Sequence, residues 1–419
     1  CNTMPRIRAI RSIMASPVPK IMQNAMFDVV AMRRLGYEVN GLAHDTMVAW
    51  NACWGDLRKK SLGLIASILT DFPFYKEEVE FVGQDDEKGQ EYCGRDCLAT
   101  HTAWNRMNEE GGEFDISGSR KGYDISMSIM DTFTAAATMG ILADRSRVKQ
   151  LHKKHLETAN EMEAALSDIA GRTLNCRSPK QIKEFVYGDL GIKRQKQSTA
   201  QDHLMDIAAA QQEGGIKEIL TAIIRVRQNR NIISRYINED IIDRDGRIRC
   251  NWNLAGTRNG RLSTTKPWWP GVALQTVPYD ARDIFIADPG TVFVGWDLGQ
   301  AEARVVALLS NDFDLINDME SGVDIHIKLG SRLPFNMTYD EIVAKCDKIG
   351  KDKTPERVLS KTARHAMNYF LTWVGLQKAV NKQYLDTEVG INAAEAKAIR
   401  NAYISLSPGL EVWWDEVYY

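Results

Sequence analysis

The sequence predicts a mixed α/β protein with more than one domain, and two observations support this fold class. The chain has 419 residues, and domains commonly contain roughly 100–200 residues each. The pattern of apolar and polar residues also changes along the chain. Residues 1 to about 115 mix short apolar runs with Gly and Pro, residues from about 120 to 240 show helical periodicity, and β-like runs followed by helices begin near Arg247. Such changes between helix and strand patterns are typical of mixed folds.

Composition limits the class of protein but does not identify a ligand. Apolar residues make up 44% of the chain, and no apolar run approaches the roughly 18–20 residues of a membrane span. Residues 1–20 lack the apolar core of a signal peptide, so we expect a soluble, cytoplasmic protein that contacts no membrane. The seven cysteines are odd in number and scattered, which is not typical of a secreted disulfide framework. A net charge of −2 argues against a simple nucleic-acid coat protein.

The middle of the chain predicts long helices. Residues 216–237 carry five basic residues against the single acid Glu218. A solvated face is the simpler interpretation of this run, and a surface for phosphates is the alternative. Another helix is predicted where side chains recur at three- and four-residue steps, in the stripe Val148, Leu151, His155, Ala159, Met162, Leu166 and Ile169.

An acidic residue follows a predicted strand. Residues 291–296 are rich in β-branched and aromatic side chains, and Asp297 comes directly after them. A carboxylate at the end of a buried strand is costly without a partner. A divalent metal is one such partner, and a helix N-cap role is the alternative.

A second candidate site is one face of a predicted helix, which carries two cationic side chains and two rings. Thr354 followed by Pro355 is typical of a helix start. Arg357, Lys361, His365 and Tyr369 then follow at four-residue steps, which places all four on one face. Two cations and two rings suit a nucleoside triphosphate, because cations bind phosphates and flat rings contact the sugar and base. A solvated basic helix is the alternative.

Together these two segments resemble motifs A and B of family A DNA polymerases. Asp297 through Arg304 has the Asp-x-Gly-Gln-x-Glu-x-Arg pattern of motif A, and Arg357 through Tyr369 has the spacing of motif B. The resemblance implies a metal ligand at Asp297, catalytic roles for Asp297, Arg357 and Lys361, and a steric gate against ribose at Glu302. It implies a dNTP site made by Gln300, Glu302, His326, Arg357, Lys361, His365 and Tyr369.

Other segments extend the resemblance. The segment from Thr257 to Thr264 resembles a TxxGRLS motif, and Gln275-Thr-Val-Pro resembles Gln-Asn-Ile-Pro. Asp324-Ile-His326 matches an Asp-x-His near the start of the fingers. These matches imply DNA contacts at Arg261, Gln275, Arg304 and Asn368, and a triphosphate contact at His326.

Three positions depart from the family pattern. Gly299 replaces a common Ser, His365 stands where Phe or Tyr is usual, and Phe370 stands where Gly usually follows the Tyr. The sequence does not tell how the changes at 365 and 370 affect incorporation. The His-x3-Tyr ending is similar to that of phage members, which would place the protein in a host cytoplasm.

The N-terminal region resembles the proofreading 3′→5′ exonuclease of the same family. Asn24 to Asp28 resembles its second motif, and Tyr92-x3-Asp96 has the spacing of its third. The resemblance implies metal ligands at Asp28 and Asp96, and a Tyr92 that orients the attacking water. No segment matches the first exonuclease motif, and none matches the polymerase motif C, because Asp415-Glu416 follows Trp414 on a predicted helix.

The resemblance implies an RNase H-like exonuclease portion followed by a right-hand polymerase with thumb, partial palm and fingers. We expect the exonuclease portion at 1–115, polymerase N-terminal helices and thumb at 116–240, palm at 241–313 and fingers at 314–419. The implied reaction adds dNTPs to a primer 3′-hydroxyl on primer–template DNA, with two Mg²⁺ ions per active site and Mn²⁺ as a substitute. Alternatives are a catalytically incomplete fragment that binds primer–template, a single-subunit RNA polymerase relative, and a free-standing exonuclease. Fidelity, processivity and accessory proteins cannot be read from the sequence.

Overall fold

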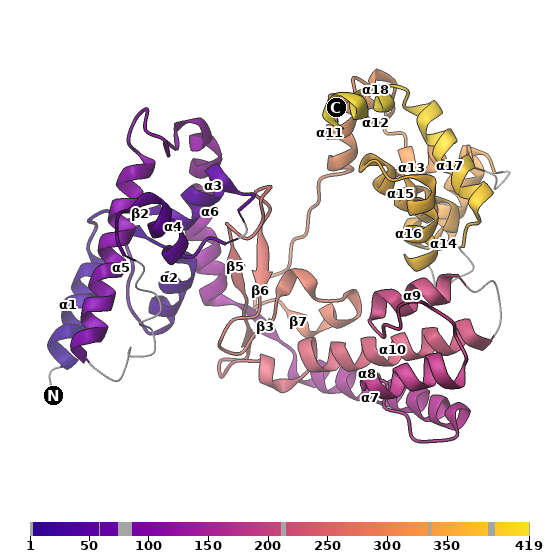
Figure 1. The fold of residues 1–419 in the computed structure, drawn as a ribbon, viewed down its shortest axis with the longest axis horizontal. Helices are drawn as coiled ribbons and strands as arrows, with labels where there is room; N and C mark the ends of the chain where they lie inside the picture. The colour runs from indigo at the N-terminus through magenta and orange to yellow at the C-terminus, as the bar shows by residue number, and fades with distance from the viewer. Residues whose placement is uncertain are drawn as a thin grey trace. The chain divides into compact units, whose positions relative to one another are not determined.

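A computed structural model of the chain describes residues 3–57, 59–73, 86–210, 215–333, 337–383 and 390–418. By residue contacts the chain divides into two compact units (Figure 1). Unit 1 comprises residues 1–155 and 231–292, and unit 2 comprises residues 156–230 and 293–419. Helices predominate and short strands accompany them, which confirms the mixed class. None of the described helices is both long enough and apolar enough to cross a membrane.

The N-terminal part of unit 1 packs helices around a short parallel pair of strands. Strand β1 (Lys20–Met22) pairs with β2 (Leu42–Asp45), and Ile21 lies opposite His44. The buried side chains of Trp50, Met107 and Tyr123 belong to the core of this part. Its helices are α1 (Thr3–Ala15), α2 (Ala25–Arg34), α3 (Thr46–Trp54), α4 (Leu62–Leu69), α5 (Asp86–Met107) and α6 (Arg120–Met139).

The remainder of unit 1 contains two small antiparallel sheets. Strand β3 (Ile141–Ala143) lies between β4 (Arg247–Ile248) and β7 (Phe285–Ile286). Strands β5 (Asn251–Asn253) and β6 (Ser263–Thr265) form a separate pair. A 3₁₀ turn at Glu239–Ile241 precedes β4, and 3₁₀ segments at Leu274–Thr276 and Tyr279–Ile284 lie between β6 and β7.

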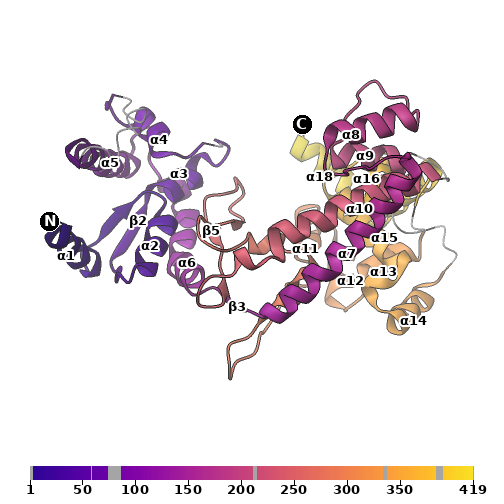
Figure 2. The same cartoon turned by 90° about the horizontal axis from the view of Figure 1, so that it is seen from below.

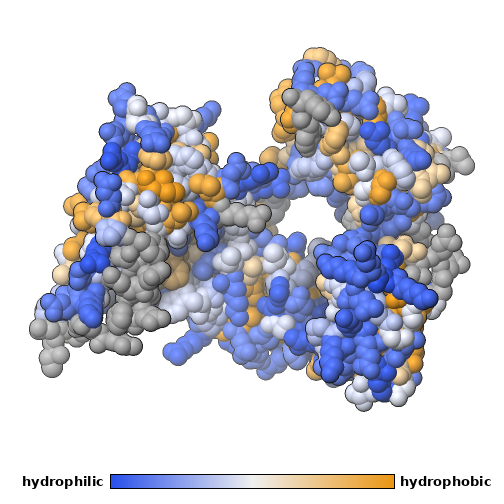
Figure 3. Space-filling model, in the orientation of Figure 1, coloured by the Kyte–Doolittle hydropathy of each residue, from blue (hydrophilic) through white to orange (hydrophobic). Residues whose placement is uncertain are grey.

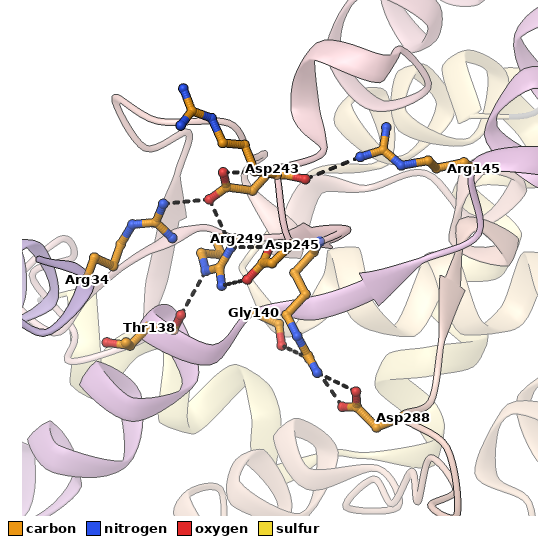
Figure 4. Close-up of polar contacts among 10 residues, drawn as sticks. Arg34, Thr138, Gly140, Arg145, Asp243, Asp245, Arg249 and Asp288 are labelled. Atoms are coloured by element: carbon orange, nitrogen blue, oxygen red, sulfur yellow. Dashed lines mark hydrogen bonds and ion pairs between the residues drawn. The ribbon is translucent and has the colours of Figure 1, made fainter. Parts of the chain in front are cut away.

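A polar network joins these parts of unit 1, as Figure 4 shows. The buried guanidinium of Arg249 donates from Nη1 to Asp243 at 2.9 Å, from Nη2 to Asp245 at 2.5 Å and from Nε to the Thr138 carbonyl at 2.7 Å. Arg34 of α2 reaches the same Asp243 carboxylate at 2.5 Å. The network therefore ties α2 and the end of α6 to the turn before β4.

Two long helices connect the units, and each belongs partly to both. They are α7 (Arg145–Ala170) and α10 (Gly215–Tyr236), which lie side by side in Figures 1 and 2. Within unit 2, Arg230 of α10 pairs with Glu163 of α7 at 2.9 Å. The predicted stripe on α7 is confirmed as helical and mostly buried, except that Ile169 is 58% exposed near the helix end.

The basic run on α10 is a solvated face only in part, because Arg235 is exposed but two other arginines make contacts within unit 2. Arg227 donates to the backbone carbonyls of Cys176 and Thr199, and Arg230 also reaches Asn160. These contacts hold the segment between α7 and α10 against α10, and that segment contains α8 (Pro179–Lys183), a π-helical turn (Glu184–Asp189) and α9 (Gln201–Ala209). The outer surface of this helical part is mainly hydrophilic on the face that Figure 3 shows.

In the C-terminal part of unit 2, the regular elements among the described residues are all helices. Leu359, Met367 and Tyr403 lie in a shared core with Leu376 and Trp414. The helices are α11 (Ala301–Leu309), α12 (Phe313–Glu320), α13 (Ile325–Gly330), α14 (Tyr339–Ile349), α15 (Pro355–Asn368), α16 (Trp373–Gln383), α17 (Ala393–Leu406) and α18 (Gly409–Tyr418). Asp415 and Glu416 lie on α18, as the sequence predicts.

One prediction is wrong. Residues 291–296 form no strand, and side chains such as Val294 and Trp296 are 81% and 84% exposed. A strand needs hydrogen-bonding neighbours, and the described part of the chain offers this segment none. Asp297 therefore does not lie at the end of a buried strand.

Candidate nucleotide site

The segment expected to carry a metal ligand leads into α11. Asp297 is exposed, and Gln300 adopts the left-handed backbone conformation (φ 58°) as the N-cap residue of that helix. Arg304 donates from Nε to the Gly299 carbonyl at 3.1 Å, so its guanidinium braces the turn. Glu302 follows in the first turn of α11, where a carboxylate interacts favourably with the helix dipole.

Glu302 is the point at which the two predicted motifs meet. One oxygen of its carboxylate, Oε2, lies 3.2 Å from Nδ1 of His365 and accepts a hydrogen bond from Tyr369 Oη at 3.3 Å. The two rings are arranged edge to face, with centroids 5.7 Å apart. The structure therefore brings Glu302, His365 and Tyr369 together, although they come from segments more than sixty residues apart.

Helix α15 displays the predicted face. Thr354 is its N-cap residue and Pro355 its first residue, although the Thr354 hydroxyl donates to the Gly350 carbonyl and does not cap the helix. Arg357, Lys361 and His365 lie at successive turns, and Tyr369 stands just beyond the last helical residue. The predicted spacing therefore holds over three turns.

The two cations of this face are engaged by acids to which the sequence analysis assigned no role. Arg357 donates from Nε to Asp324 at 2.9 Å, and Asp352 lies 3.7 Å from Arg357 and 3.9 Å from Lys361. Burial opposes ionisation of Asp324, but the hydrogen bond and charge of Arg357 lower its pKa below the ordinary value. The sequence did offer a signal for Asp324, because Asp is a preferred N-cap residue. It could have been predicted to cap the helix that carries His326.

His326 lies in the first turn of α13. Its backbone N–H donates to the Asp324 carboxylate at 3.0 Å, and its Nδ1 is buried without a hydrogen-bond partner among the described residues. Burial, followed by the charge of Arg364, lowers the pKa of His326 to about 4. The ring is therefore uncharged at neutral pH, and it can serve a phosphate as a hydrogen-bond donor but not as a cation.

The predicted DNA contacts are divided between the units. In unit 1, Gln275 donates to the Leu262 carbonyl at 3.1 Å, and the Thr257 hydroxyl donates to the Arg261 carbonyl at 2.7 Å. The exposed side chains of Arg261 and Gln275 are thus presented by one folded hairpin region. In unit 2, the Asn368 side chain accepts a hydrogen bond from Tyr403.

The departure at Phe370 has a structural consequence. Phe370 has φ 61°, in the left-handed region where glycine is favoured and other residues are strained. Its ring packs edge-on against Trp414, with centroids 5.1 Å apart. The backbone conformation explains why Gly suits this position, and the ring contact offsets part of the strain.

The N-terminal motifs surround a buried carboxylate. Asp45 accepts backbone hydrogen bonds from Asn24 at 3.3 Å, Ala25 at 2.6 Å, Met47 at 2.8 Å and Val48 at 3.1 Å. It therefore caps both α2 and α3. Asp28 follows in the first turn of α2, with an exposed side chain. Partial desolvation, and then the nearby charge of Asp45, raise the pKa of Asp28.

The third exonuclease pattern lies on α5. Tyr92 and Asp96 are one turn apart on this helix and half-buried. The described residues contain no group of three or more His, Cys, Asp or Glu side chains arranged to hold a metal ion. Asp28 and Asp96 therefore do not form such a group with a third ligand, and neither does Asp297. A pair of divalent ions needs several oxygen ligands, so the residues described do not fit a two-metal site on their own.

Comparisons with known proteins support the resemblance to the polymerase family. The model of DNA polymerase family A matches residues 145–419. DNA polymerase I of Chloroflexus aurantiacus is 25% identical over an alignment that covers 98% of this chain and 43% of that protein. DNA polymerase I of Synechocystis is 26% identical, over 92% of this chain and 38% of that protein. The chain thus spans less than half the length of these curated relatives.

A solved structure shows the same fold. It is the "POL domain of Pol1 from M. smegmatis complex with DNA primer-template and dNTP", with a TM-score of 0.72, 21% identity, and coverage of 99% of this chain and 68% of that one. The named relatives are bacterial, so the phage type stays a prediction. The family model spans well over half of the chain, including α11 and α15. The chain belongs to DNA polymerase family A.

Proposed function

We propose that this chain carries the nucleotide-selecting part of a template-directed DNA polymerase that adds dNTPs to a primer 3′-hydroxyl. The observation that carries the proposal is the contact of Glu302 with both His365 and Tyr369. It joins motif A to motif B at the place where a sugar would be examined. A DNA polymerase is favoured over an RNA polymerase because Glu302 is the residue that would exclude a ribose 2′-hydroxyl.

The remaining site residues contact the triphosphate or the DNA. Lys361 is exposed and its ion pair with Asp352 is long at 3.9 Å, so phosphates can replace Asp352 at low cost. Arg357 is half-buried and held by Asp324 at 2.9 Å, and it supplies a fixed positive charge. Neutral His326 donates one hydrogen bond. Arg261 and Gln275 contact the duplex, with Arg304 and Asn368 as further DNA contacts.

Metal use follows from the family and not from this chain's geometry. Polymerases of the family generally use divalent metals, and we infer that Mg²⁺ serves here, with Mn²⁺ as a substitute. Asp297 offers one exposed carboxylate, and among the described residues it belongs to no group of three or more side chains that could hold a metal ion. We therefore assign no step of the reaction to a metal on these residues alone. Action on DNA would place the protein in the cytoplasm.

Primer extension tests the proposal. It is measured with this chain and with a form that continues beyond Tyr419, using dNTPs or rNTPs with Mg²⁺. We expect dNTP extension by the longer form, and a Glu302→Ala variant that accepts rNTPs more readily. Lys361→Ala should raise the KM for dNTPs, and Lys382→Ala, at a half-buried lysine paired with the exposed Asp202, is the control. Extension that is equally good with rNTPs in the unmodified protein would contradict the assignment of Glu302. Binding of primer without extension by either form would favour a primer–template-binding fragment.

A proofreading exonuclease is a second proposal, supported by the position of Asp28 beside Asp45 and of Tyr92 and Asp96 on one face of α5. It predicts that a protein with 3′→5′ nuclease activity loses it in Asp28→Ala and Asp96→Ala but keeps primer extension. Asp131→Ala, at an exposed acid paired with Arg33, is the control. Nuclease activity that is unchanged in both variants would remove this proposal and leave the polymerase proposal standing.

A further inference from the structure

A buried arginine in α15 has no role in the function proposed so far. Arg364 is 2% exposed. Its Nη2 donates to the Ile325 carbonyl at 3.2 Å, and its guanidinium carbon lies 4.8 Å from the centroid of the Tyr403 ring. Its Nε and Nη1 have no hydrogen-bond partner among the described residues. A buried cation with unpaired donors is costly, so a hydrophobic residue would serve the core better.

Nearby acids do not offset the cost of burying the Arg364 cation. Asp312 and Asp318 act on Arg364 through their charges, but in the described part of the chain neither forms an ion pair with it. Asp318 is paired with Lys328, and Asp312 caps α12 through the Leu315 N–H at 2.9 Å. Among the described residues, these two acids therefore do not neutralise Arg364 through an ion pair.

One contact of Arg364 lies directly beside His326. The carbonyl that accepts its hydrogen bond belongs to Ile325, the residue directly before His326, and Tyr403 comes from α17. One side chain thus joins the first turn of α13 to α15 and α17. The charged groups that face the His326 ring are Asp324 from the same turn, and Arg357, Lys361 and Arg364 from α15. The Lys328–Asp318 pair lies between α13 and α12.

We propose that Arg364 is a positioning residue of the nucleotide site, which fixes the first turn of α13 against α15 so that His326 presents its ring to the triphosphate. This inference rests on the proposed function, because it assumes that His326 contacts the nucleotide. Arg364 itself touches neither substrate nor reacting atoms. Its charge has a second effect, since it adds to burial in keeping the His326 ring neutral.

Two variants separate the hydrogen bond of Arg364 from its charge. Arg364→Lys keeps the charge. Arg364→Gln carries no charge, and its amide nitrogen ends two bonds short of the Nη2 position that donates to the Ile325 carbonyl. The His326 pKa is measured in the chain by NMR titration of ¹³C-labelled histidines, with His326→Gln identifying the signal. Binding of dGTP with Mg²⁺ is measured on a primer–template with cytosine as the templating base.

We expect His326 to titrate near pH 4 in the unmodified chain and in Arg364→Lys. In Arg364→Gln its pKa should rise by about one pH unit, since burial still lowers it. The affinity for dGTP should fall roughly tenfold in Arg364→Gln, which is the smaller of the losses caused by removing outer partners of a ligand site. A residue that serves stability alone would shift the unfolding midpoint but leave the His326 pKa in place.

The outcomes are distinguishable. A His326 pKa near its ordinary value in the unmodified chain overturns the inference, even if Arg364→Gln does not fold. An unchanged pKa and unchanged dGTP affinity in a folded Arg364→Gln also overturns it. If the unmodified chain binds no dGTP while the pKa shift occurs as expected, the proposed function fails and the link between Arg364 and His326 stands.

Discussion

At the scale of single residues, two positions that break a local backbone rule lie beside the nucleotide site. Gln300 and Phe370 are non-glycine residues in the left-handed backbone region, and each adjoins a segment that carries Glu302 or Tyr369. Strain of this kind persists only where surrounding contacts hold it. For Phe370 the contact is the Trp414 ring.

Substitutions at Phe370 separate the backbone strain at this position from the contact of its ring with Trp414. Replacing it with Ala removes the ring contact and keeps the unfavourable φ, whereas replacing it with Gly removes both. Because a left-handed conformation costs an L-residue about 1–2 kcal/mol, we expect Phe370→Gly to be more stable than Phe370→Ala by about 1 kcal/mol. Urea unfolding of the two variants measures the difference. An Ala variant at least as stable as the Gly variant would show that the backbone is not strained there.

The residue pattern of the site could be predicted only in part. Arg357, Lys361 and His365 are spaced four residues apart, and helix geometry places such residues on one face. The sequence was therefore sufficient to predict this face. The pairing of Arg357 with Asp324 joins two helices and depends on tertiary packing, which no local pattern reports. The burial of Arg364 was missed for the same reason, because a basic residue on a basic helix is expected to be solvated.

At the scale of elements, the long helices were predictable and the strands were not. Helix α7 has a clear apolar period, whereas residues 291–296 have strand-forming side chains but no pairing neighbour among the described residues. β-propensity reflects a fit to a partly buried sheet and is weak without one. The short strands β3 to β7 contain two or three residues each, too few for a periodic signal.

Asp45 stabilises two elements at once, because it accepts backbone hydrogen bonds at the start of both α2 and α3. Asp45→Ala would leave those donors buried and unpaired. We expect it to lower the free energy of unfolding by about 3 kcal/mol. Asp45→Asn keeps an acceptor oxygen and should cost less. Equal losses in the two variants, measured by urea unfolding, would show that the carboxylate oxygens are not acting as caps.

Arg249 holds the network of Figure 4 together. Arg249→Met should lower stability by roughly 3 kcal/mol, at the low end of the range for breaking a buried ion pair. The loss is limited because Asp243 retains Arg34 and Asp245 reaches solvent. Arg258→Met is the matched control, since its pair with Asp56 is exposed on both sides. A loss no larger than that of the control would contradict the structural role of the network.

The same network predicts a dependence of stability on acid. The hydrogen bond from Arg249 lowers the pKa of Asp245. Burial raises the pKa of Asp243, but the hydrogen bonds from Arg34 and the Arg244 N–H, with the charges of Arg34 and Arg249, together lower it. A carboxyl with a lowered folded-state pKa stabilises the fold above its ordinary value, 3.8, and that stabilisation disappears as the pH falls through the folded-state value. Unfolding measured below about pH 4 should therefore depend less steeply on pH in Arg249→Met. Identical pH profiles for the two proteins would argue against the ion pairs.

At the scale of the whole molecule, family membership was predictable because motifs A and B occur in the right order over much of the chain. The family model and the fold confirm it. Metal ligation was not predictable in the same way. It requires carboxylates from distant segments to converge, and spacing along the chain does not report convergence. The chain also spans less than half the length of its curated relatives, so activity of the whole protein stays a proposal.

The central claim is that α11 and α15 form a site for a nucleotide chosen by the template. Equilibrium binding tests it most directly, with a primer that ends in a dideoxynucleotide so that no reaction can occur. We expect the dNTP that pairs with the templating base to bind at least about tenfold more tightly than a mismatched dNTP, a modest difference of about 1.4 kcal/mol. The preference should follow the base when the template is changed, and Glu302→Ala should narrow the gap between dNTP and rNTP. Nucleotide binding that ignores the template base, or no nucleotide binding to the primer–template complex, would contradict the claim.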